Sequence, residues 1–304
     1  MKLLCTDLDR TLLPNGDESE SPAARPVLWH LLQSHAVALA YVSGRDLARI
    51  LKSVQQYELQ KPDVIVADVG TSVYVRDGEG WLLQEAWQLQ IADDWNGLDS
   101  EDMRELLASF NELEDQEADR QTRFKRSYYL PRELDTENLK LRLEELLAGQ
   151  GIKASLVFSD DPQKNVQLLD VLPLHATKVD AIRHVQKLLE VDNEQTLFSG
   201  DSGNDVTALA SEIPSVTVRN ADLPTREAVR RLAALNATEA SSYQAEGALS
   251  LAGGRALNGN YAAGIVEGLV HFNSAWSELL DSEAWVAKAL ELYALQGEAG
   301  SLQA

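Results

Sequence analysis

Two aspartates near the start of the chain, Asp7 and Asp9, stand two residues apart in the run DLDRT at residues 7–11. They follow the apolar run LLCT, which is typical of a buried strand, and precede a Pro-Asn-Gly loop signal at residues 14–16. In an extended chain, residues i and i+2 point to the same side, so the two carboxylates lie close together. Such a pair is costly unless a cation or a shared proton separates the charges, and Mg²⁺ prefers carboxylate oxygens. Taken alone, the spacing fits two interpretations equally well: a cation or proton site, and an acidic loop after a first strand.

Other polar groups follow later apolar runs. Ser43 follows the run at residues 36–42, Lys178 opens an expected helix, and Asp201 and Asp205 lie in the run GDSGND after the expected strand 195–199. The carboxyl ends of neighbouring parallel strands meet at one edge of a sheet, where ligands bind. Four carboxylates at that edge would repel one another strongly, so a divalent cation is close to a requirement. A donor set made only of oxygens favours Mg²⁺ over zinc.

The expected elements explain how such residues could meet. Strands at 3–6, 36–42 and 63–67 alternate with helices at 22–34 and 47–57, and this rhythm returns from residue 177 onward, which predicts a parallel sheet with covering helices. Between them lie a hairpin at 73–83, helices at 101–114 and 134–148, and strands at 126–130, 152–159 and 165–172, the last two separated by a polar turn at 160–162. The sequence predicts an α/β protein with a Rossmann-like core of residues 1–83 and 173–304. An α+β cap domain, residues 84–172, is inserted in it, and a long helix is expected over 276–295.

Composition narrows the classes of partner. The chain has 304 residues, a formal net charge of -21 and an isoelectric point near 4.6. Such a surface argues against nucleic acid and anionic membranes as partners. Cys5 is the only cysteine, so no intrachain disulfide can form. With no signal-peptide pattern and no apolar run near 18 residues, a cytoplasmic protein is expected.

The ordered set D-x-D-x-T, S-G-R, a lone lysine and G-D-S-G-N-D resembles the haloacid dehalogenase superfamily of phosphatases. Within it, the chain is most similar to sucrose-phosphate phosphatases on four runs, YVSGR at 41–45, VGTSVY at 69–74, KRSY at 125–128 and VTVRNA at 216–221. Each motif alone could be a turn, a helix cap or a solvated side chain. Because they occur together, in this order and at strand ends, the catalytic interpretation is favoured. The resemblance covers residues 1–272.

The resemblance implies an Mg²⁺-dependent phosphoric monoester hydrolase with an aspartyl-phosphate intermediate. Asp7 would attack phosphorus, and Asp9 would protonate the leaving oxygen and then activate water. The resemblance assigns phosphate binding, with loop support, to Thr11, Ser43, Gly44, Lys178 and Asn204. It assigns the metal to Asp7, Asp201 and the backbone carbonyl of Asp9, with Asp205 in support.

The implied substrate is a phosphorylated sugar or disaccharide, most closely sucrose 6-phosphate, which would place the protein in sucrose biosynthesis. Another glycosyl phosphate, such as mannosylfructose phosphate, is the alternative. The candidate substrate contacts are Arg45, Thr71, Ser72, Lys125 and Lys164. Lys164 lies near the place where the family carries a glycine-lysine sugar loop that is absent here. Arg10 stands where the family usually has a small or polar residue.

A different class of function is a non-catalytic protein with the same fold that docks on a glycosyltransferase, a sugar-phosphate synthase. The motive is the predicted C-terminal helix, which carries Trp276 and Trp285. No catalytic position is missing from the motifs, and this favours the enzyme.

Overall fold

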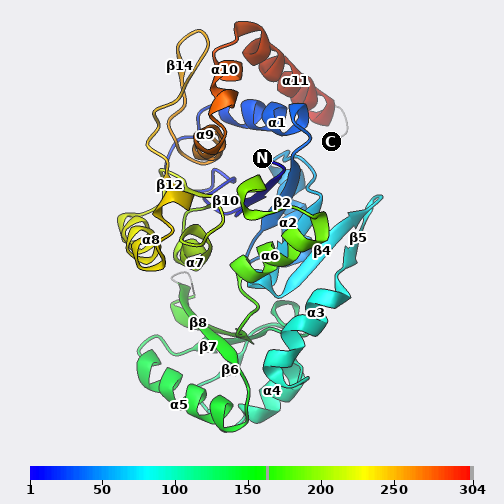
Figure 1. Ribbon diagram of the computed structural model, residues 1–304. Helices are drawn as coiled ribbons and strands as arrows, with labels where there is room; N and C mark the ends of the chain where they lie inside the picture. Colours follow the sequence, from blue (N-terminus) through cyan, green and yellow to red (C-terminus); the bar gives the residue numbers. More distant parts are fainter. Residues whose placement is uncertain (162–163, 302–304) are drawn as a thin grey trace. The chain divides into compact units, whose positions relative to one another are not determined.

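The computed structural model of the chain describes residues 1–161 and 164–301 (Figure 1). The chain divides into two compact units: unit 1 comprises Met1–Ser43, Ala48–Ile65 and Ile182–Ala304, and unit 2 comprises Gly44–Leu47 and Val66–Ala181. The predicted cap, residues 84–172, falls inside unit 2, which also takes in the hairpin before it. The boundaries of the cap stay a prediction.

A parallel sheet forms the centre of unit 1. Its strand order is β12-β11-β10-β1-β2-β3, and the pairs from β12 through β2 are all parallel. The strands are β1 (Leu3–Thr6), β2 (Ala38–Val42), β3 (Val64–Ala67), β10 (Thr196–Gly200), β11 (Ser215–Thr217) and β12 (Ser242–Gln244). Every residue of β1, β3, β10 and β11 is buried, as expected of parallel strands that are covered on both faces. The predicted α/β class is confirmed, although β12 was not among the predicted strands.

Helices cover this sheet (Figure 1). They are α1 (Ala24–Ser34), α2 (Leu47–Gln56), α6 (Lys178–Leu189), α7 (Val206–Leu209), α8 (Leu223–Asn236) and α9 (Ala262–Phe272). Helix α9 packs on β10, β11 and β12 with α1 beside it, while α7 contacts β10 and β11 and α8 contacts β12. A small hairpin, β13 (Ser250–Leu251) and β14 (Arg255–Ala256), precedes α9. None of the helices in the described part of the chain has both the length and the apolar character that a membrane crossing requires.

The C-terminal helix differs from its prediction. Instead of one helix over 276–295, the structure has a 3₁₀ turn, η7 (Ser274–Trp276), then α10 (Ser277–Leu280), and then α11 (Glu283–Ser301). The break falls at Ser282, whose backbone oxygen accepts from the Val286 amide and whose hydroxyl accepts from the Trp285 amide. A serine that caps a helix in this way begins a new one. The prediction of a continuous helix was therefore wrong.

The two tryptophans of this region pack inside unit 1. The ring of Trp276 lies 4.4 Å from that of His35, and the ring of Trp285 lies 4.6 Å from that of His30. His30 lies in α1, His35 directly follows it, and α11 packs against α1. These contacts account for the tryptophans without a docking partner.

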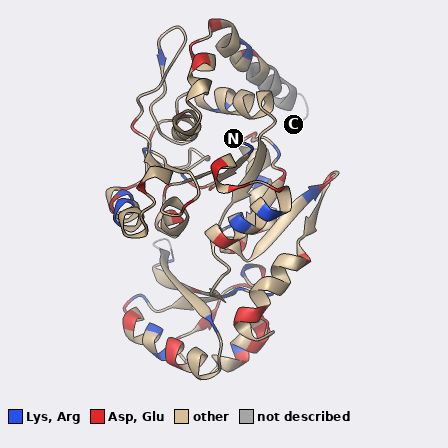
Figure 2. Ribbon diagram, viewed as in Figure 1, with Lys and Arg blue, Asp and Glu red and all other residues tan. Residues whose placement is uncertain are grey.

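Unit 2 contains an antiparallel pair and a separate antiparallel sheet. The pair is β4 (Ser72–Asp77) with β5 (Gly80–Leu83), and the sheet has the order β6-β7-β9-β8. The sheet strands are β6 (Glu114–Asp115), β7 (Arg126–Leu130), β8 (Ala154–Asp161) and β9 (Val166–Pro173), and the helices are α3 (Glu85–Ala92), α4 (Ser100–Leu106) and α5 (Thr136–Gly149). Figure 2 shows acidic residues on both α4 and α5.

Two local predictions in unit 2 were wrong. The helix expected over 101–114 ends at Leu106, and residues 114–115 form β6 instead. There Asp115 reaches Arg126 of β7 at 2.6 Å, and Tyr129 pairs with Glu114, so contacts with β7 override the helical pattern. The turn expected at 160–162 lies partly outside the described residues, and β8 continues to Asp161.

The chain leaves β3 through a strained turn, η1 (Asp68–Gly70). Asp68 and Val69 have φ angles of 53° and 62°, and Gly70 has a φ of 114°, a region that L side chains rarely adopt. A Cβ added at Gly70 would lie 2.8 Å from the carbonyl carbon and oxygen of Thr177. The carbonyl of Gly70 also accepts a hydrogen bond of 2.9 Å from the indole of Trp87. The turn therefore packs directly against the chain that leads into α6.

Gly70→Ala should be strongly destabilising, because its Cβ would meet backbone atoms that cannot swing aside. We expect a loss of about 3 kcal/mol or more in the free energy of unfolding, measured by urea titration. Gly78→Ala is the matched control: Gly78 also has a positive φ, of 57°, but a Cβ there would meet nothing within 4 Å. The control should lose only about 1 kcal/mol. Equal losses in the two variants would contradict this account of the turn.

Candidate active site

Three buried carboxylates meet at the carboxyl ends of β1 and β10. Asp7, Asp201 and Asp205 are 5%, 4% and 0% exposed, and each offers an oxygen that lies within 4.8 Å of the others. The register explains the meeting: Thr6 pairs with Ser199, and the Asp7 amide donates to the Ser199 carbonyl at 2.9 Å. Three like charges at this distance, removed from water, repel strongly. The set contains only carboxylate oxygens, which fits a hard divalent cation.

The loop after β1 is folded tightly around one carbonyl. The oxygen of Leu8 accepts from the amides of Thr11, Leu12 and Leu13 at 3.3, 3.0 and 2.7 Å. This turn buries Thr11 and directs its hydroxyl to Asp201 Oδ1, 2.9 Å away. Thr11 therefore links the first loop to the carboxylate of the second.

Asp205 is held by hydrogen bonds from other residues of its own loop, the loop after β10. Asp205 Oδ2 accepts from the Ser202 hydroxyl at 2.9 Å and from the amides of Ser202 and Asp201 at 3.2 and 3.3 Å. A Cβ at Gly200 would lie 2.7 Å from the Asp205 side chain, so the close approach requires glycine there. Asn204 is exposed and accepts from the Ser202 hydroxyl at 2.9 Å, which ties it to the same loop.

Asp9 is held by a residue that the sequence prediction did not include. Asn15 donates from Nδ2 to Asp9 Oδ1 at 2.7 Å, and its Oδ1 accepts from the Arg10 amide at 2.8 Å. Asn15 belongs to the Pro-Asn-Gly loop signal, so its position was visible in the sequence but its contact was not. One side chain thus orients the second aspartate and the backbone beside it.

Arg10 has a left-handed backbone, with φ 59°, and its side chain lies beside the acidic cluster. Its Nε is 3.5 Å from Asp201 Oδ2, and the side chain is 47% exposed. The Arg10 carbonyl accepts from Asn220 Nδ2 at 2.6 Å, while Asn220 Oδ1 accepts from the Tyr261 amide at 2.9 Å. Asn220, in the run VTVRNA, thus clamps the first loop to the start of α9.

Ser43 comes directly after β2, which pairs with β1, and its side chain is 1% exposed. It follows the strand next to the one that leads into Asp7. Within unit 1, the predicted residues therefore follow three adjacent strands, β10, β1 and β2.

The remaining predicted residues belong to unit 2. Lys178 is 2% exposed and opens α6. Thr177 caps this helix: the Asp180 amide donates to Thr177 Oγ1 at 3.2 Å, and the Thr177 hydroxyl donates to Asp180 Oδ2 at 2.6 Å. With Gly70 packed against Thr177, the start of α6 is fixed in two ways.

A second cluster of charged groups in unit 2 surrounds Asp68, which is 4% exposed. Burial raises the pKa of its carboxyl to about 6, against the charge of Lys125 and a hydrogen bond from Ser72, and with added repulsion from Asp46 and Asp170. Lys125 Nζ lies 3.9 Å from Asp170 Oδ2. Two predicted substrate contacts, Lys125 and Ser72, therefore face a buried carboxyl that sequence reasoning did not single out.

The other predicted contacts are engaged in different ways. Thr71 Oγ1 donates to the Asp68 carbonyl at 3.1 Å, and the Arg45 carbonyl accepts from the Asp68 amide at 3.0 Å. Gly44 precedes Arg45 at the surface. Lys164 is half exposed and binds Glu117 Oε1 at 3.1 Å and the Tyr129 hydroxyl. Its role at a sugar remains a prediction.

Comparison with known proteins gives the relationship. The model of the sucrose-6F-phosphate phosphohydrolase family matches residues 1–273 of the chain. The chain belongs to this family. The resemblance to the haloacid dehalogenase superfamily is thereby confirmed, and the family supports a phosphatase.

Individual relatives agree with this placement. A HAD-like hydrolase of Nitrosococcus oceani is 44% identical over 280 residues, which cover 91% of this chain and 74% of that protein. A protein of Arabidopsis thaliana with the name probable sucrose-phosphatase 3a is 30% identical over 223 residues, 72% of this chain, and the match spans only 50% of the plant protein. A mannosylfructose-phosphate phosphatase of Agrobacterium fabrum is 28% identical over 206 residues, which cover 67% of this chain and 77% of that protein.

A solved structure of a sucrose-phosphatase also has a similar fold. The sucrose-phosphatase of Synechocystis, solved in complex with sucrose and phosphate, is 25% identical and superposes with a TM-score of 0.68. The match covers 90% of this chain and 98% of that one.

Asp68 should make stability depend on pH. Folding raises the pKa of Asp68 from 3.8 to about 6, so the folded state binds the proton more tightly than the unfolded state does. The stabilisation that this proton provides is fully present below pH 3.8 and is lost as the pH rises through 6. Asp68→Asn should therefore gain unfolding free energy relative to the wild type between about pH 4 and pH 7, by at most about 3 kcal/mol. Urea titrations across this range measure the gain. The exposed Asp77→Asn is the control, and a pH-independent difference for Asp68→Asn would refute the assignment.

Proposed function

We propose that this protein is a phosphatase that releases a neutral sugar from a sugar phosphate, with sucrose 6-phosphate as its most favoured substrate. The proposal rests on one observation: Asp7, Asp201 and Asp205 form a buried carboxylate cluster at the ends of β1 and β10. Membership of the sucrose-6F-phosphate phosphohydrolase family supports the substrate class.

In the proposed reaction, a carboxylate oxygen of Asp7 attacks phosphorus and forms an aspartyl phosphate as the bond from phosphorus to the sugar oxygen breaks. Asp9 donates its proton to the leaving sugar oxygen. It then takes a proton from water, whose oxygen attacks phosphorus and releases inorganic phosphate from Asp7. Asn15 would hold the Asp9 carboxyl in place for both transfers.

Other residues of the chain would bind the phosphoryl group. Ser43 would donate a hydrogen bond to a phosphoryl oxygen, and Lys178 would offset the charge on the oxygens during transfer. Thr11 would keep Asp201 in position, and Ser202 would do the same for Asp205. Mg²⁺, held by Asp7, Asp201 and the Asp9 carbonyl with support from Asp205, would supply positive charge that neutralises the phosphoryl oxygens.

The substrate itself is tested with a panel of phosphorylated sugars. In the presence of Mg²⁺, we expect phosphate release from sucrose 6-phosphate with the highest kcat/KM, and at least ~10³-fold less release by Asp7→Asn, which keeps the shape of the side chain but not its nucleophile. The exposed Asp77→Asn should match the wild type. A preference for mannosylfructose phosphate would support the alternative that the Agrobacterium relative suggests. Equal turnover of many simple sugar phosphates would overturn the disaccharide specificity.

Mg²⁺ and Asp7→Asn should have crossed effects on stability. With EDTA, the variant should melt at a higher temperature than the wild type, because one of three repelling charges is gone. With Mg²⁺ at a hundredfold excess over its Kd, the wild type should gain about 2.7 kcal/mol and the variant much less. Thermal melts in both buffers give the four values. The same order of melting temperatures in both buffers would count against a cation at this cluster.

Asn15 should matter for turnover more than for binding. Asn15→Ala removes the hydrogen bond to Asp9, and we expect kcat to fall about 10-fold with little change in KM. Asn15→Asp keeps an acceptor for the Arg10 amide but sets a carboxylate against Asp9, so its loss should be larger. Steady-state kinetics on both variants measure the effect. A rise in KM with unchanged kcat would show that Asn15 does not orient Asp9.

A further inference from the structure

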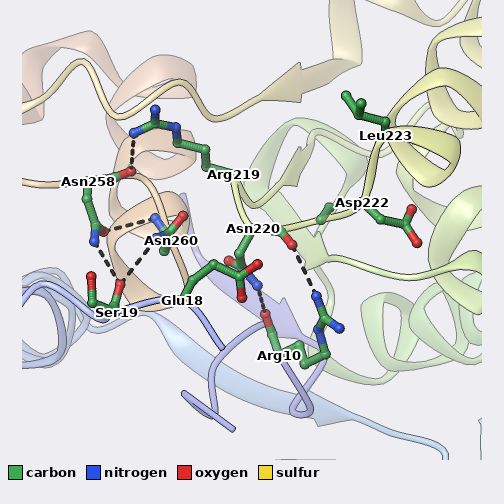
Figure 3. Close-up of a pocket in the computed structure, with 10 residues that line it drawn as sticks. Arg10, Glu18, Ser19, Arg219, Asn220, Asp222, Leu223, Asn258 and Asn260 are labelled. Carbon is green, nitrogen blue, oxygen red and sulfur yellow. Dashed lines mark hydrogen bonds between the residues drawn. The ribbon is translucent and has the colours of Figure 1, made fainter. Parts of the chain in front are cut away.

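A cavity of about 600 Å³ opens in unit 1 beside the first catalytic loop (Figure 3). Its walls come from the loop after β1, the segment between β11 and α8, and the segment between β14 and α9. A volume of this size lies within the range of about 300–1,000 Å³ that is usual for small-molecule sites. Its polar lining includes Arg10, Glu18, Arg219, Asp222, Asn258 and Asn260.

The charges of this lining balance. Arg10 and Arg219 supply two cations, and Glu18 and Asp222 supply two carboxylates. Guanidinium groups only donate hydrogen bonds, ionised carboxylates only accept them, and carboxamides do both. A ligand that satisfies all three kinds must carry groups that donate and accept together, as hydroxyls do. An anion such as phosphate, by contrast, would meet two carboxylates in a protein whose net charge is already -21.

Hydrogen bonds hold the amides of the cavity in place before any ligand arrives. Asn258 and Asn260 both donate from Nδ2 to the Ser19 carbonyl, at 2.8 and 3.2 Å, and Asn258 Oδ1 accepts from the Asn260 amide at 3.1 Å. Arg219 Nη1 donates to the Asn258 carbonyl at 3.1 Å (Figure 3). A carboxamide can make four hydrogen bonds and a guanidinium five, so these contacts use only part of their capacity. The donors and acceptors are thus fixed in direction, which lowers the entropy cost of binding.

An apolar surface accompanies the polar groups. Leu223, at the first position of α8, lines the cavity with 70% of its surface exposed, and Ala221 lines it nearby. A sugar ring presents C–H groups on its faces and hydroxyls at its edge, so it matches a lining of this mixed kind better than a fully polar ion does.

Arg10 connects the cavity to the acidic cluster. It lines the cavity, and its Nε lies 3.5 Å from Asp201 Oδ2. Its Nη2 donates to the Asn220 carbonyl at 3.3 Å, in the same segment as Arg219. A ligand in the cavity would therefore contact a residue that immediately follows Asp9.

We propose that this cavity is a second site on unit 1 for a neutral, polyhydroxylated ligand, a free sugar, bound through Arg10, Arg219 and the two carboxamides with Leu223 against the ring. The site is distinct from the phosphoryl position at Asp7 and does not need the phosphatase reaction in order to bind. It would let the protein hold a sugar without phosphate next to its catalytic loop.

Hydrogen exchange measured by mass spectrometry tests the site, with sucrose as the probe. In the protein without substrate, we expect millimolar sucrose to slow exchange in peptides that cover residues 217–223 and 256–261. Inorganic phosphate should not slow it. No protection in these segments, or protection by phosphate alone, would overturn the proposal.

A steric block provides the matched comparison. Leu223→Trp fills the rim of the cavity without removing a hydrogen bond, and because Leu223 is exposed the fold should tolerate it. Leu235→Trp makes the same change on the same helix, where Leu235 is 81% exposed and lies outside the cavity lining. Sucrose should lose at least ~10-fold in affinity for the cavity in Leu223→Trp and stay within ~2-fold in Leu235→Trp. Equal affinities in the two variants would refute the site.

The two proposals can fail separately. A protein that hydrolyses sugar phosphates but shows no sucrose protection in these segments would lack the second site and keep the phosphatase function. A protein with protection and no phosphatase activity would keep the sugar site and lose the reaction.

Discussion

The repulsion among three buried carboxylates is the constraint on which the rest of unit 1 depends. Asp7, Asp201 and Asp205 cannot move apart, since Asp7 is tied to β10 through the Ser199 carbonyl and Asp205 is tied to its own loop by three donors. Without such restraints, the three carboxylates would separate and become exposed to water. The adjacent parallel strands prevent this, and the loops supply hydrogen bonds that stabilise each carboxylate separately. Positive charge beside the cluster would reduce the repulsion that remains.

Arg10 brings a positive charge close to this cluster, with its Nε 3.5 Å from Asp201 Oδ2. Because its side chain is half exposed, solvent screens much of the attraction, and one guanidinium cannot balance three carboxylates. Its position depends on an unfavourable left-handed backbone, which Asn15 and Asn220 hold from both sides of the peptide. The same geometry turns the guanidinium toward the cavity. Thus one residue in a strained conformation serves both the cluster and the cavity.

The sequence was sufficient to predict the strands whose residues are buried and therefore apolar. Apolar runs located β1, β2, β3 and β10, and the motifs after them located the carboxylates, because fully buried strands leave little freedom in where polar residues can begin. The sequence was insufficient where a contact with another residue determines the local structure. Residues 114–115 form β6, where Arg126 pairs with Asp115, and a new helix, α11, begins after Ser282 because the Ser282 hydroxyl caps it. Asn15 was visible as a loop residue, but its bond to Asp9 depends on the turn around Leu8.

The residues that the resemblance assigns to the reaction are divided between the units: the carboxylates belong to unit 1, and Lys178 to unit 2. Within unit 2, Lys178 does not depend on its helix alone. The strained turn at Asp68–Gly70 packs on Thr177, and Thr177 caps the helix that Lys178 opens. The same turn carries the buried Asp68 carboxyl, whose neighbours include Lys125 and Ser72. The start of α6 and the predicted sugar contacts therefore share one turn, and a change in that turn would disturb both together.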